Sequence, residues 1–353
     1  MQTQVKFSDF EIIPVMKSLH KEEIDDKTYF SKQYSRYISN SRLRYIDPTR
    51  GGTPSQYKNP PTFNTSESLI IGSAVHEVLL QPESFELSTI TRPNAKLGMV
   101  IEMVYELRRK GWKLYDAIHT ACTKVSYYVN SIDRKIPSII KSGLQYYLNR
   151  LEDDKKHYDK EQIYLSESNY KTVTKCLESC YENHTLLKTL NPTDMFGDPI
   201  DSYCEDALFI DFLVTYKGRH CATLPFKLKA DNWTIDFDNK IVTLNDLKTS
   251  GHPVSGFMDP GHSFDNFAYD IQMACYSHIL WYYCEKTFGV CKNQGWKLEA
   301  NMLVVQTIPP YASQCFPVSR SRLKHGWNKF EQLIKRVAYY EIFGYENKVK
   351  FID

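Results

Sequence analysis

The chain has 353 residues, enough for one large domain or two smaller ones, and its 42% hydrophobic and 24% charged residues argue against disorder. Its formal net charge of +2, from 44 basic and 42 acidic residues, excludes binding to nucleic acid through overall charge, so such binding needs local patches. No apolar stretch approaches the roughly 20 residues of a membrane-spanning helix, so no membrane contact is expected.

The nine cysteines are an odd number, are scattered, and follow no apolar signal segment. We therefore expect reduced thiols and a cytoplasmic location. An iron–sulfur cluster needs closely spaced cysteine ligands. The nearest groupings are Cys176 with Cys180, which has helical spacing, and Cys284 with Cys291. We expect no cluster.

The first half of the chain is predicted to be mainly helical. Residues 1–64 have the pattern of an irregular, partly helical region, with Ser39 placed to cap a short helix and a loop over 48–61. Apolar residues then recur three or four positions apart, which predicts further helices. These are expected over 69–80, 99–109, 115–129, 139–151 and 166–190.

After Pro192 the pattern changes to the alternation typical of strands. Strands are expected over 207–214 and 223–228, followed by a hairpin whose arms are 233–237 and 241–247. A long loop over 251–265, a helix over 267–285, a strand over 302–307 and a basic helix over 319–343 complete the chain. This order predicts an α/β or α+β core with an N-terminal helical elaboration.

A short motif, Asp246-Leu247-Lys248, ends the apolar run 241–244. Side chains alternate along a strand, so Asp246 and Lys248 share one face, roughly 7 Å apart, while Leu247 points into the core. A carboxylate and an amine in this arrangement can help to hold a divalent metal and orient water at a phosphodiester. Alone the motif is weak, because a solvated strand end has the same pattern.

Candidate metal ligands elsewhere in the chain strengthen the motif. Two-metal hydrolases need several oxygen or nitrogen ligands from different elements, at least two of them anionic, with metals about 4 Å apart. His76 lies in an apolar helix, one turn after Gly72, where it is either a ligand or a core histidine bonded to a carbonyl. The candidates, in chain order, are His76, Glu205, Asp231 and Asp246, followed by Lys248.

The segment 71–85, IGSAVHEVLLQPESF, resembles the GxxxHxxLLxPExF block of RecE-type phage exonucleases, within the PD-(D/E)xK nuclease superfamily. Further blocks follow in the family's order and together span most of residues 29–310. They are Ser39-Asn40-Ser41-Arg42-Leu43 with Gln56-Tyr57, Glu205 before a strand, Lys229-Ala230-Asp231, Asp246-Leu247-Lys248-Thr249-Ser250, and Tyr269-Asp270-Ile271-Gln272-Met273-Ala274-Cys275-Tyr276.

The resemblance implies a restriction-endonuclease-like mixed sheet flanked by helices, with residues 1–64 packed on a nuclease domain of 65–353 that carries a helical insertion near 97–190. It implies two Mg²⁺ or Mn²⁺ ions and degradation of duplex DNA from its ends, typically 5′ to 3′, for recombination with a single-strand annealing protein. A homo-oligomer and the cytoplasm of a phage host are implied as well.

By the same resemblance, each site residue receives a role. His76, Asp231, Asp246 and the carbonyl of Leu247 would bind metal, and Glu205 would complete the acidic site. Lys248 would orient or activate the attacking water and offset charge in the transition state. The remaining two, Gln272 and Tyr276, lie one helical turn apart and would position substrate or Lys248.

Three departures from the family pattern leave points open. Ala230 replaces the proline of the superfamily name, either Glu205 or Asp206 could face the metal, and the segments 97–160 and 251–265 are longer than the family core. Two other readings stay open: a catalytically silent protein that binds DNA ends or a host nuclease, and a nuclease of different polarity or substrate. Basic residues that could contact phosphate are Arg36, Arg42, Arg44, Arg50, Lys227, Lys229, Arg320, Arg322, Lys324, Lys329, Lys335 and Arg336.

Overall fold

The structure is a computed structural model that describes residues 3–61, 66–346 and 348–352. The chain divides into two compact units. The first, here called the sheet unit, comprises the described residues of 1–64, 183–305 and 313–353. The second, the helical unit, comprises those of 65–182 and 306–312. Each unit is described by itself.

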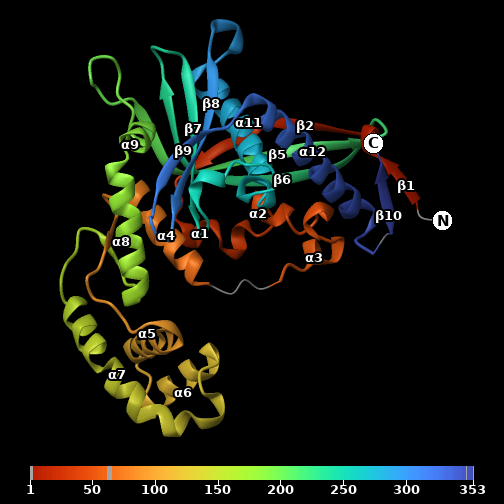
Figure 1. The fold of residues 1–353 in the computed structure, drawn as a ribbon. Helices are drawn as coiled ribbons and strands as arrows, with labels where there is room; N and C mark the ends of the chain where they lie inside the picture. Colours follow the sequence, from red (N-terminus) through yellow and green to blue (C-terminus); the bar gives the residue numbers. More distant parts are fainter. Residues whose placement is uncertain (1–2, 62–65, 347, 353) are drawn as a thin grey trace. The chain divides into compact units, whose positions relative to one another are not determined.

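A six-stranded sheet forms the core of the sheet unit (Figure 1). All neighbouring strands pair antiparallel except β7 and β8. Lys297 at the start of β8 donates its backbone N–H to Lys240, just before β7, at 2.9 Å, and Asn301 bonds Asn245 further along, so these two strands run parallel. The prediction of a mixed sheet flanked by helices is therefore confirmed. The strand order is β2 (Phe10–Glu22), β5 (Asp201–Tyr216), β6 (Arg219–Asp236), β7 (Ile241–Ser250), β8 (Lys297–Gln306) and β9 (Ser313–Pro317).

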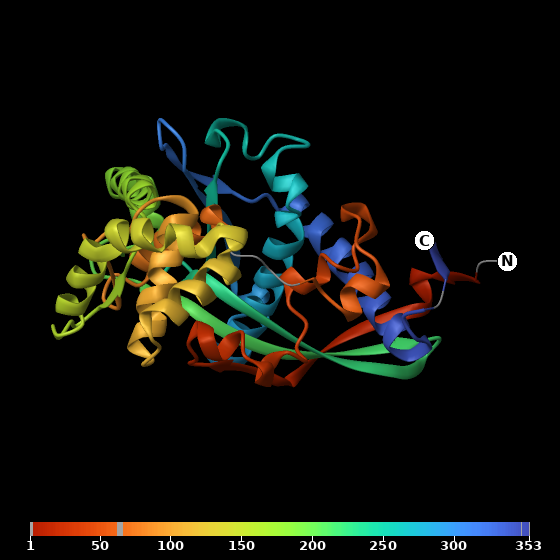
Figure 2. The same ribbon diagram turned by 90° about the horizontal axis from the view of Figure 1, so that it is seen from below.

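Two long helices, α11 (Tyr269–Phe288) and α12 (Arg320–Phe343), pack against each other and against the sheet (Figures 1 and 2). Their close approach requires Gly326, because a Cβ there would lie 1.9 Å from the carbonyl oxygen of Asp270. Phe330 of α12 contacts Phe212 and Phe226 of the sheet edge to face. These buried contacts hold α11 beside β7, where the Asp246 motif lies.

Residues 1–61 contain more strand than expected. β2 forms an edge of the sheet, and its Pro14 is tolerated there because an edge strand leaves one row of N–H groups unpaired. The register shift between Val15 and His20 obscures the alternation in the sequence. Short helices follow, and the cap predicted at Ser39 is present, since its side chain accepts the N–H of Arg42. The small elements here are β1 (Thr3–Lys6), which pairs with β10 (Val349–Ile352), α1 (Asp26–Tyr29), α2 (Asn40–Leu43) and α3 (Pro54–Lys58).

The helical unit confirms the helices predicted from apolar spacing, whose buried residues include Val100, Ile118 and Ile139. The predicted helix 115–129 instead ends at Val125, because Ser126 adopts a left-handed conformation. The predicted helix 166–190 is broken at Asn183, whose side chain caps α9 (His184–Leu190) of the sheet unit. The elements are α4 (Glu67–Leu80), β3 (Phe85–Leu87), α5 (Ala95–Arg109), α6 (Leu114–Val125), α7 (Ile132–Asp153), β4 (Glu161–Ile163) and α8 (Glu167–Glu182).

β6 is one continuous strand where two were predicted. Lys229 and Asp231 interrupt the apolar pattern between the two predicted segments, yet they belong to the strand and lie in the candidate site described below. Part of the predicted loop before α11 forms α10 (Ser263–Asn266). Among the residues that the structure describes, every helix is too short or too polar to cross a membrane.

Candidate active site

Three acids lie in one row across three adjacent strands of the sheet. The register pairs Cys204 with Asn232 and Asp206 with Ala230, which places Glu205 of β5 opposite Asp231 of β6. On the other side, Asn232 pairs with Asn245, which places Asp231 opposite Asp246 of β7. Residues opposite each other on neighbouring strands share a face. We call Glu205, Asp231 and Asp246 the acid row.

Glu205 has φ of +57° within β5, a left-handed conformation that is uncommon for a residue with a side chain. Strained backbone of this kind persists where the surrounding structure enforces it, and it concentrates at functional sites. One carboxylate oxygen of Glu205 lies within 4.8 Å of one of Asp231. The neighbouring Asp206 instead accepts bonds from Lys21 Nζ at 3.1 Å and Trp233 Nε1 at 2.9 Å. The acid adjacent to Asp231 is therefore Glu205.

Lys248 is held between two members of the acid row. Its Nζ lies 2.5 Å from Asp246 Oδ2 and 3.8 Å from Asp231 Oδ2. Burial by itself lowers the pKa of Lys248, but the Asp246 and Asp231 carboxylates raise it above its ordinary value overall. Lys248 is consequently a fixed cation, because it carries its proton throughout the neutral range.

Lys229 neutralises the other end of the acid row. Its Nζ lies 2.6 Å from Glu205 Oε2 and also bonds Asp26 of α1. Burial raises the pKa of Glu205, Asp231 raises it further, and the Lys229 contact only partly offsets this. The pKa of Asp231 is also raised by burial, against the opposing effects of Lys248 and the Leu247 N–H. The row thus favours the binding of cations.

Two predicted site residues of α11 lie beside the acid row. Gln272 donates from Nε2 to Asp246 Oδ1 at 2.7 Å. Tyr276, one turn along, has its pKa raised well above normal by burial, with further contributions from Tyr29, Asp246 and Asp231. In β7, Leu247 donates its N–H to Asp231 Oδ2 at 2.8 Å and accepts Lys248 Nζ at its carbonyl, at 3.2 Å.

A second row of polar side chains fixes the register of these strands. Asn245 donates to Asn232 Oδ1 at 2.7 Å and accepts from Asn301 at 3.0 Å, and Asn232 donates to Ser202 at 3.0 Å. Asn232 and Asn245 are 1% and 0% exposed, and each directly neighbours an acid of the acid row. We call Asn232, Asn245 and Asn301 the amide row. A slip of one residue would break these buried bonds, so the amide row keeps the acids aligned.

The amide row and Asp26 were not predicted from the sequence. The sequence does contain a signal for the amide row. The order Asp231-Asn232 before the hairpin turn is reversed as Asn245-Asp246 after it. Extending the predicted hairpin pairs Asn232 with Asn245 and so aligns the acids. No comparable signal marked Asp26, which is far away in sequence.

His76 lies in α4 of the helical unit and is partly buried. The residue takes part in an interaction within the structure. A role for His76 as a metal ligand remains a prediction.

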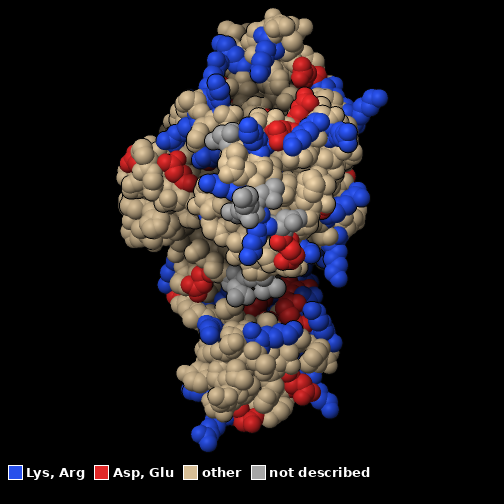
Figure 3. Space-filling model, turned by 90° about the vertical axis from the view of Figure 1, so that its right-hand side faces the viewer, with Lys and Arg blue, Asp and Glu red and all other residues tan. Residues whose placement is uncertain are grey.

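Several basic residues predicted to contact phosphate are instead bonded within the protein. Lys227 is 6% exposed and donates to the carbonyl of Tyr29, so it does not present its ammonium to solvent. Lys229 is paired as described above. The remaining bonded members are Arg36, which donates to the Tyr37 hydroxyl, Arg42, which donates to the carbonyl of Ser35, Arg50, which donates to that of Phe267, Arg322, which donates to that of Met258, and Lys329, which pairs with Asp270. Figure 3 shows Lys and Arg scattered over one face of the molecule with Asp and Glu among them.

Comparison with known proteins gives only distant similarity. No family model and no curated protein matches the chain by sequence. A crystal structure from Eubacterium rectale, described as a "putative exonuclease", aligns over 92% of this chain and 88% of its own, with 14% identity and a TM-score of 0.45. Protein VC1899 from Vibrio cholerae aligns over 81% of this chain and 59% of its own, with 9% identity and a TM-score of 0.16. At these scores neither similarity supports an argument about function.

The donor set of the acid row fits a hard divalent cation. Carboxylate oxygens from Glu205, Asp231 and Asp246 are the ligand type that Mg²⁺ and Mn²⁺ prefer. Zinc sites, by contrast, are usually built from cysteine and histidine. Two ammonium groups, those of Lys229 and Lys248, offset only part of the negative charge of the three acids. The arrangement can therefore bind a cation and an anionic substrate side by side.

Proposed function

We propose that this protein is a metal-dependent nuclease that hydrolyses phosphodiester bonds of DNA, acting as an exonuclease on duplex ends, 5′ to 3′. The observation that carries the proposal is the acid row with Lys248 held between Asp231 and Asp246. The resemblance of the sequence motifs to RecE-type exonucleases supports DNA as the substrate. Recombination through an annealing protein is the role that follows from this resemblance.

In this mechanism the acids Glu205, Asp231 and Asp246 would hold Mg²⁺ or Mn²⁺, with His76 as a further ligand. The metal supplies Lewis acidity toward the phosphate and lowers the pKa of water. Lys248, a fixed cation, orients the attacking water and offsets the negative charge that develops on the phosphoryl oxygens. Gln272 restrains Asp246 through its amide and so keeps Lys248 in position.

The decisive experiment is digestion of linear and circular duplexes, labelled at the 5′ or the 3′ end, with Mg²⁺ or Mn²⁺. The proposal expects early release of the 5′ label from linear duplex and no cutting of closed circles. It expects Asp246→Ala to abolish release, while Asp238→Asn, in the exposed hairpin turn, remains active. Early release of the 3′ label would indicate a nuclease of the opposite polarity, and cutting of closed circles would indicate an endonuclease.

The catalytically silent alternative makes a different prediction in the same assay. A protein that only binds DNA ends would retard labelled duplex in gels and release no nucleotide with either metal. Equal activity of the wild type and Asp246→Ala would instead trace the cleavage to a contaminant or to another site, and would overturn the assignment of the acid row.

A further inference from the structure

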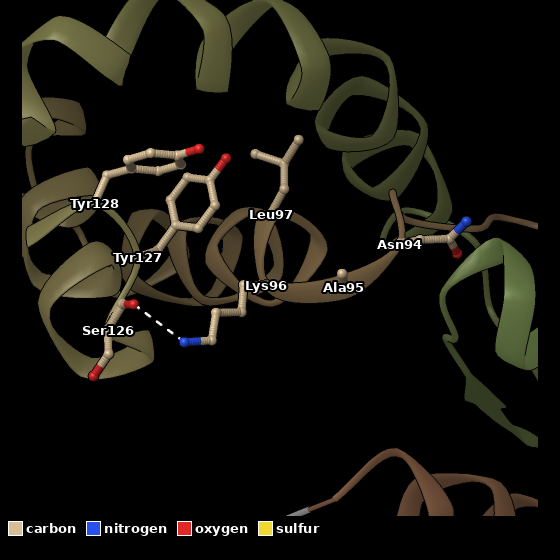
Figure 4. A pocket seen from close by; sticks show the side chains of 7 residues that line it. All are labelled: Asn94, Ala95, Lys96, Leu97, Ser126, Tyr127 and Tyr128. Atoms are coloured by element: carbon tan, nitrogen blue, oxygen red, sulfur yellow. Dashed lines mark hydrogen bonds between the residues drawn. The ribbon is translucent and has the colours of Figure 1, made fainter.

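An open cavity lies in the helical unit, whereas the acid row belongs to the sheet unit. Its volume is about 490 Å³, within the usual range of ligand sites. It is lined by the start of α5 and by the turn that follows α6, and Figure 4 shows the rings of Tyr127 and Tyr128 pointing into the same space as Leu97. The lining residues are Asn94, Ala95, Lys96, Leu97, Ser126, Tyr127 and Tyr128.

The backbone around this cavity is strained. Ala95, Ser126 and Tyr128 have φ of +56°, +55° and +46°, three of the eight non-glycine residues with positive φ that the structure describes. A bulky residue such as tyrosine is an outlier in this conformation. The turn is held by backbone bonds from Tyr127 to Cys122 and from Ser131 to Tyr128, both 2.8 Å. This strain presents the Tyr128 ring at the surface, where it is 51% exposed, while Tyr127 is partly buried and packs against the core of the helical unit.

Two lysines flank the tyrosines. Lys96 Nζ lies 3.3 Å from the carbonyl oxygen of Ser126, and Lys135 Nζ lies 4.3 Å from the centre of the Tyr128 ring. Residues 95–153, from α5 to α7, contain ten Lys and Arg and six Asp and Glu, a net charge of +4, whereas the whole chain carries +2. The region is therefore more basic than the rest of the protein, and its cavity combines the exposed ring of Tyr128 with nearby ammonium groups.

We propose that this cavity binds single-stranded DNA, with an unpaired base stacking on Tyr128, beside Tyr127, and phosphates contacting Lys96 and Lys135. Aromatic side chains beside basic ones are the usual elements of single-strand binding. Bases in a duplex already stack on each other, so an exposed tyrosine ring favours unpaired ones. The choice of DNA rests on the proposed nuclease function, and the site would hold the strand that an exonuclease leaves behind.

The test is fluorescence anisotropy of a labelled 20-nucleotide thymidine oligomer with the full-length protein in EDTA, at fixed salt. Loss of one stacking partner should weaken binding about 5- to 100-fold in Tyr128→Ala, while Tyr128→Phe stays within about twofold. Lys96→Gln should weaken binding less and reduce its salt dependence. Tyr181→Ala, a matched control on α8 with 49% exposure, should bind as the wild type does.

A folding defect is excluded by Tyr128→Gly, because glycine relieves the positive φ and should preserve thermal stability while abolishing stacking. Binding of the oligomer by Tyr128→Gly or Tyr128→Ala as tight as that by Tyr181→Ala would overturn the proposal. An equal loss of affinity for a 20-base-pair duplex would also overturn it. Wild-type protein that cleaves no DNA but binds the oligomer through Tyr128 would contradict the nuclease proposal alone.

Discussion

The acid row and the amide row cross the same strands side by side, yet they are built in opposite ways. The buried asparagines of the amide row bond to one another and to the carbonyls of Thr189 and Leu190 at the end of α9. The acids carry like charges and depend on two lysines for compensation. A row of mutually bonded amides stabilises strand pairing, whereas a row of acids destabilises the sheet unless a cation is present. We infer that the amide row serves structure and the acid row serves function.

The largest effect is expected from removing the cation that lies between two acids. Lys248→Met should lower nuclease activity by about 10²–10³-fold, the range seen when one group that stabilises a transition state is removed. The melting temperature should also depend more strongly on Mg²⁺, because a bound metal then becomes the main compensation for the negative charges of Asp231 and Asp246.

The measurements are nucleotide release and a thermal melt with and without Mg²⁺. Lys297→Met, at the exposed start of β8, is the matched control and should behave as the wild type. If Lys248→Met kept full activity, Lys248 would have no part in the chemistry.

Disruption of the amide row should affect stability first. Asn245→Leu keeps the branched shape of the side chain but removes the partner of Asn232 Oδ1 and of the Asn301 amide, so the free energy of unfolding should fall by about 2–3 kcal/mol. Urea unfolding measures this loss. Asn293→Ala, an exposed asparagine, should change stability little. A stable Asn245→Leu protein would contradict the structural role of the amide row.

Lys227 offers a contrast with Lys248, because it is a buried lysine with no carboxylate beside it among its described contacts. Burial lowers its pKa from 10.5 to about 8, and its Nζ lies 4.0 Å from the centre of the Tyr29 ring. Between pH 8 and 10.5 the unfolded chain binds more protons at this position than the folded chain, so stability rises with pH there. Below pH 8 the penalty of burying the charge is fully present.

Lys227→Met should therefore stabilise the protein by about 2 kcal/mol at pH 7, and the advantage should shrink as the pH approaches 10. Melting temperatures of variant and wild type, measured in parallel from pH 7 to 10, report the difference. Lys217→Met changes an exposed lysine and should show no such trend. A constant advantage across the range would mean that Lys227 does not titrate as described.

The sequence predicted the sheet and the acids better than the contacts between distant segments. Alternating residues predicted the hairpin, and the hairpin determines which residue lies opposite Asp231. The left-handed conformation of Glu205 could not be predicted, because glutamate has no local preference for it and tertiary contacts impose it. The same holds for β2, whose partner β5 is about 190 residues away in the chain.

Lys229 and Lys227 also show that contacts between distant segments could not be predicted from the sequence. Both are at alternate positions of one strand, and both were predicted to contact phosphate. Lys229 pairs with Glu205 and Asp26, while Lys227 is covered by Tyr29. These partners lie in β5 and in α1, and α1 is about 200 residues earlier in the chain. The spacing of residues along β6 therefore could not reveal them.

The smallest effect is expected at the outer end of the acid row. Asp26 is 61% exposed, and a solvent-exposed ion pair contributes about 1 kcal/mol at most, so Asp26→Ala should change the free energy of unfolding by less than that. The effect on the site should be larger, because Lys229 then keeps Glu205 as its described carboxylate partner and should bind it more firmly. Half-maximal activity should then require more Mg²⁺, while Asp9→Ala, which loosens the pair with Lys217, should leave that requirement unchanged. A lower Mg²⁺ requirement in Asp26→Ala would mean that Asp26 restrains Glu205 and does not compete with it for Lys229.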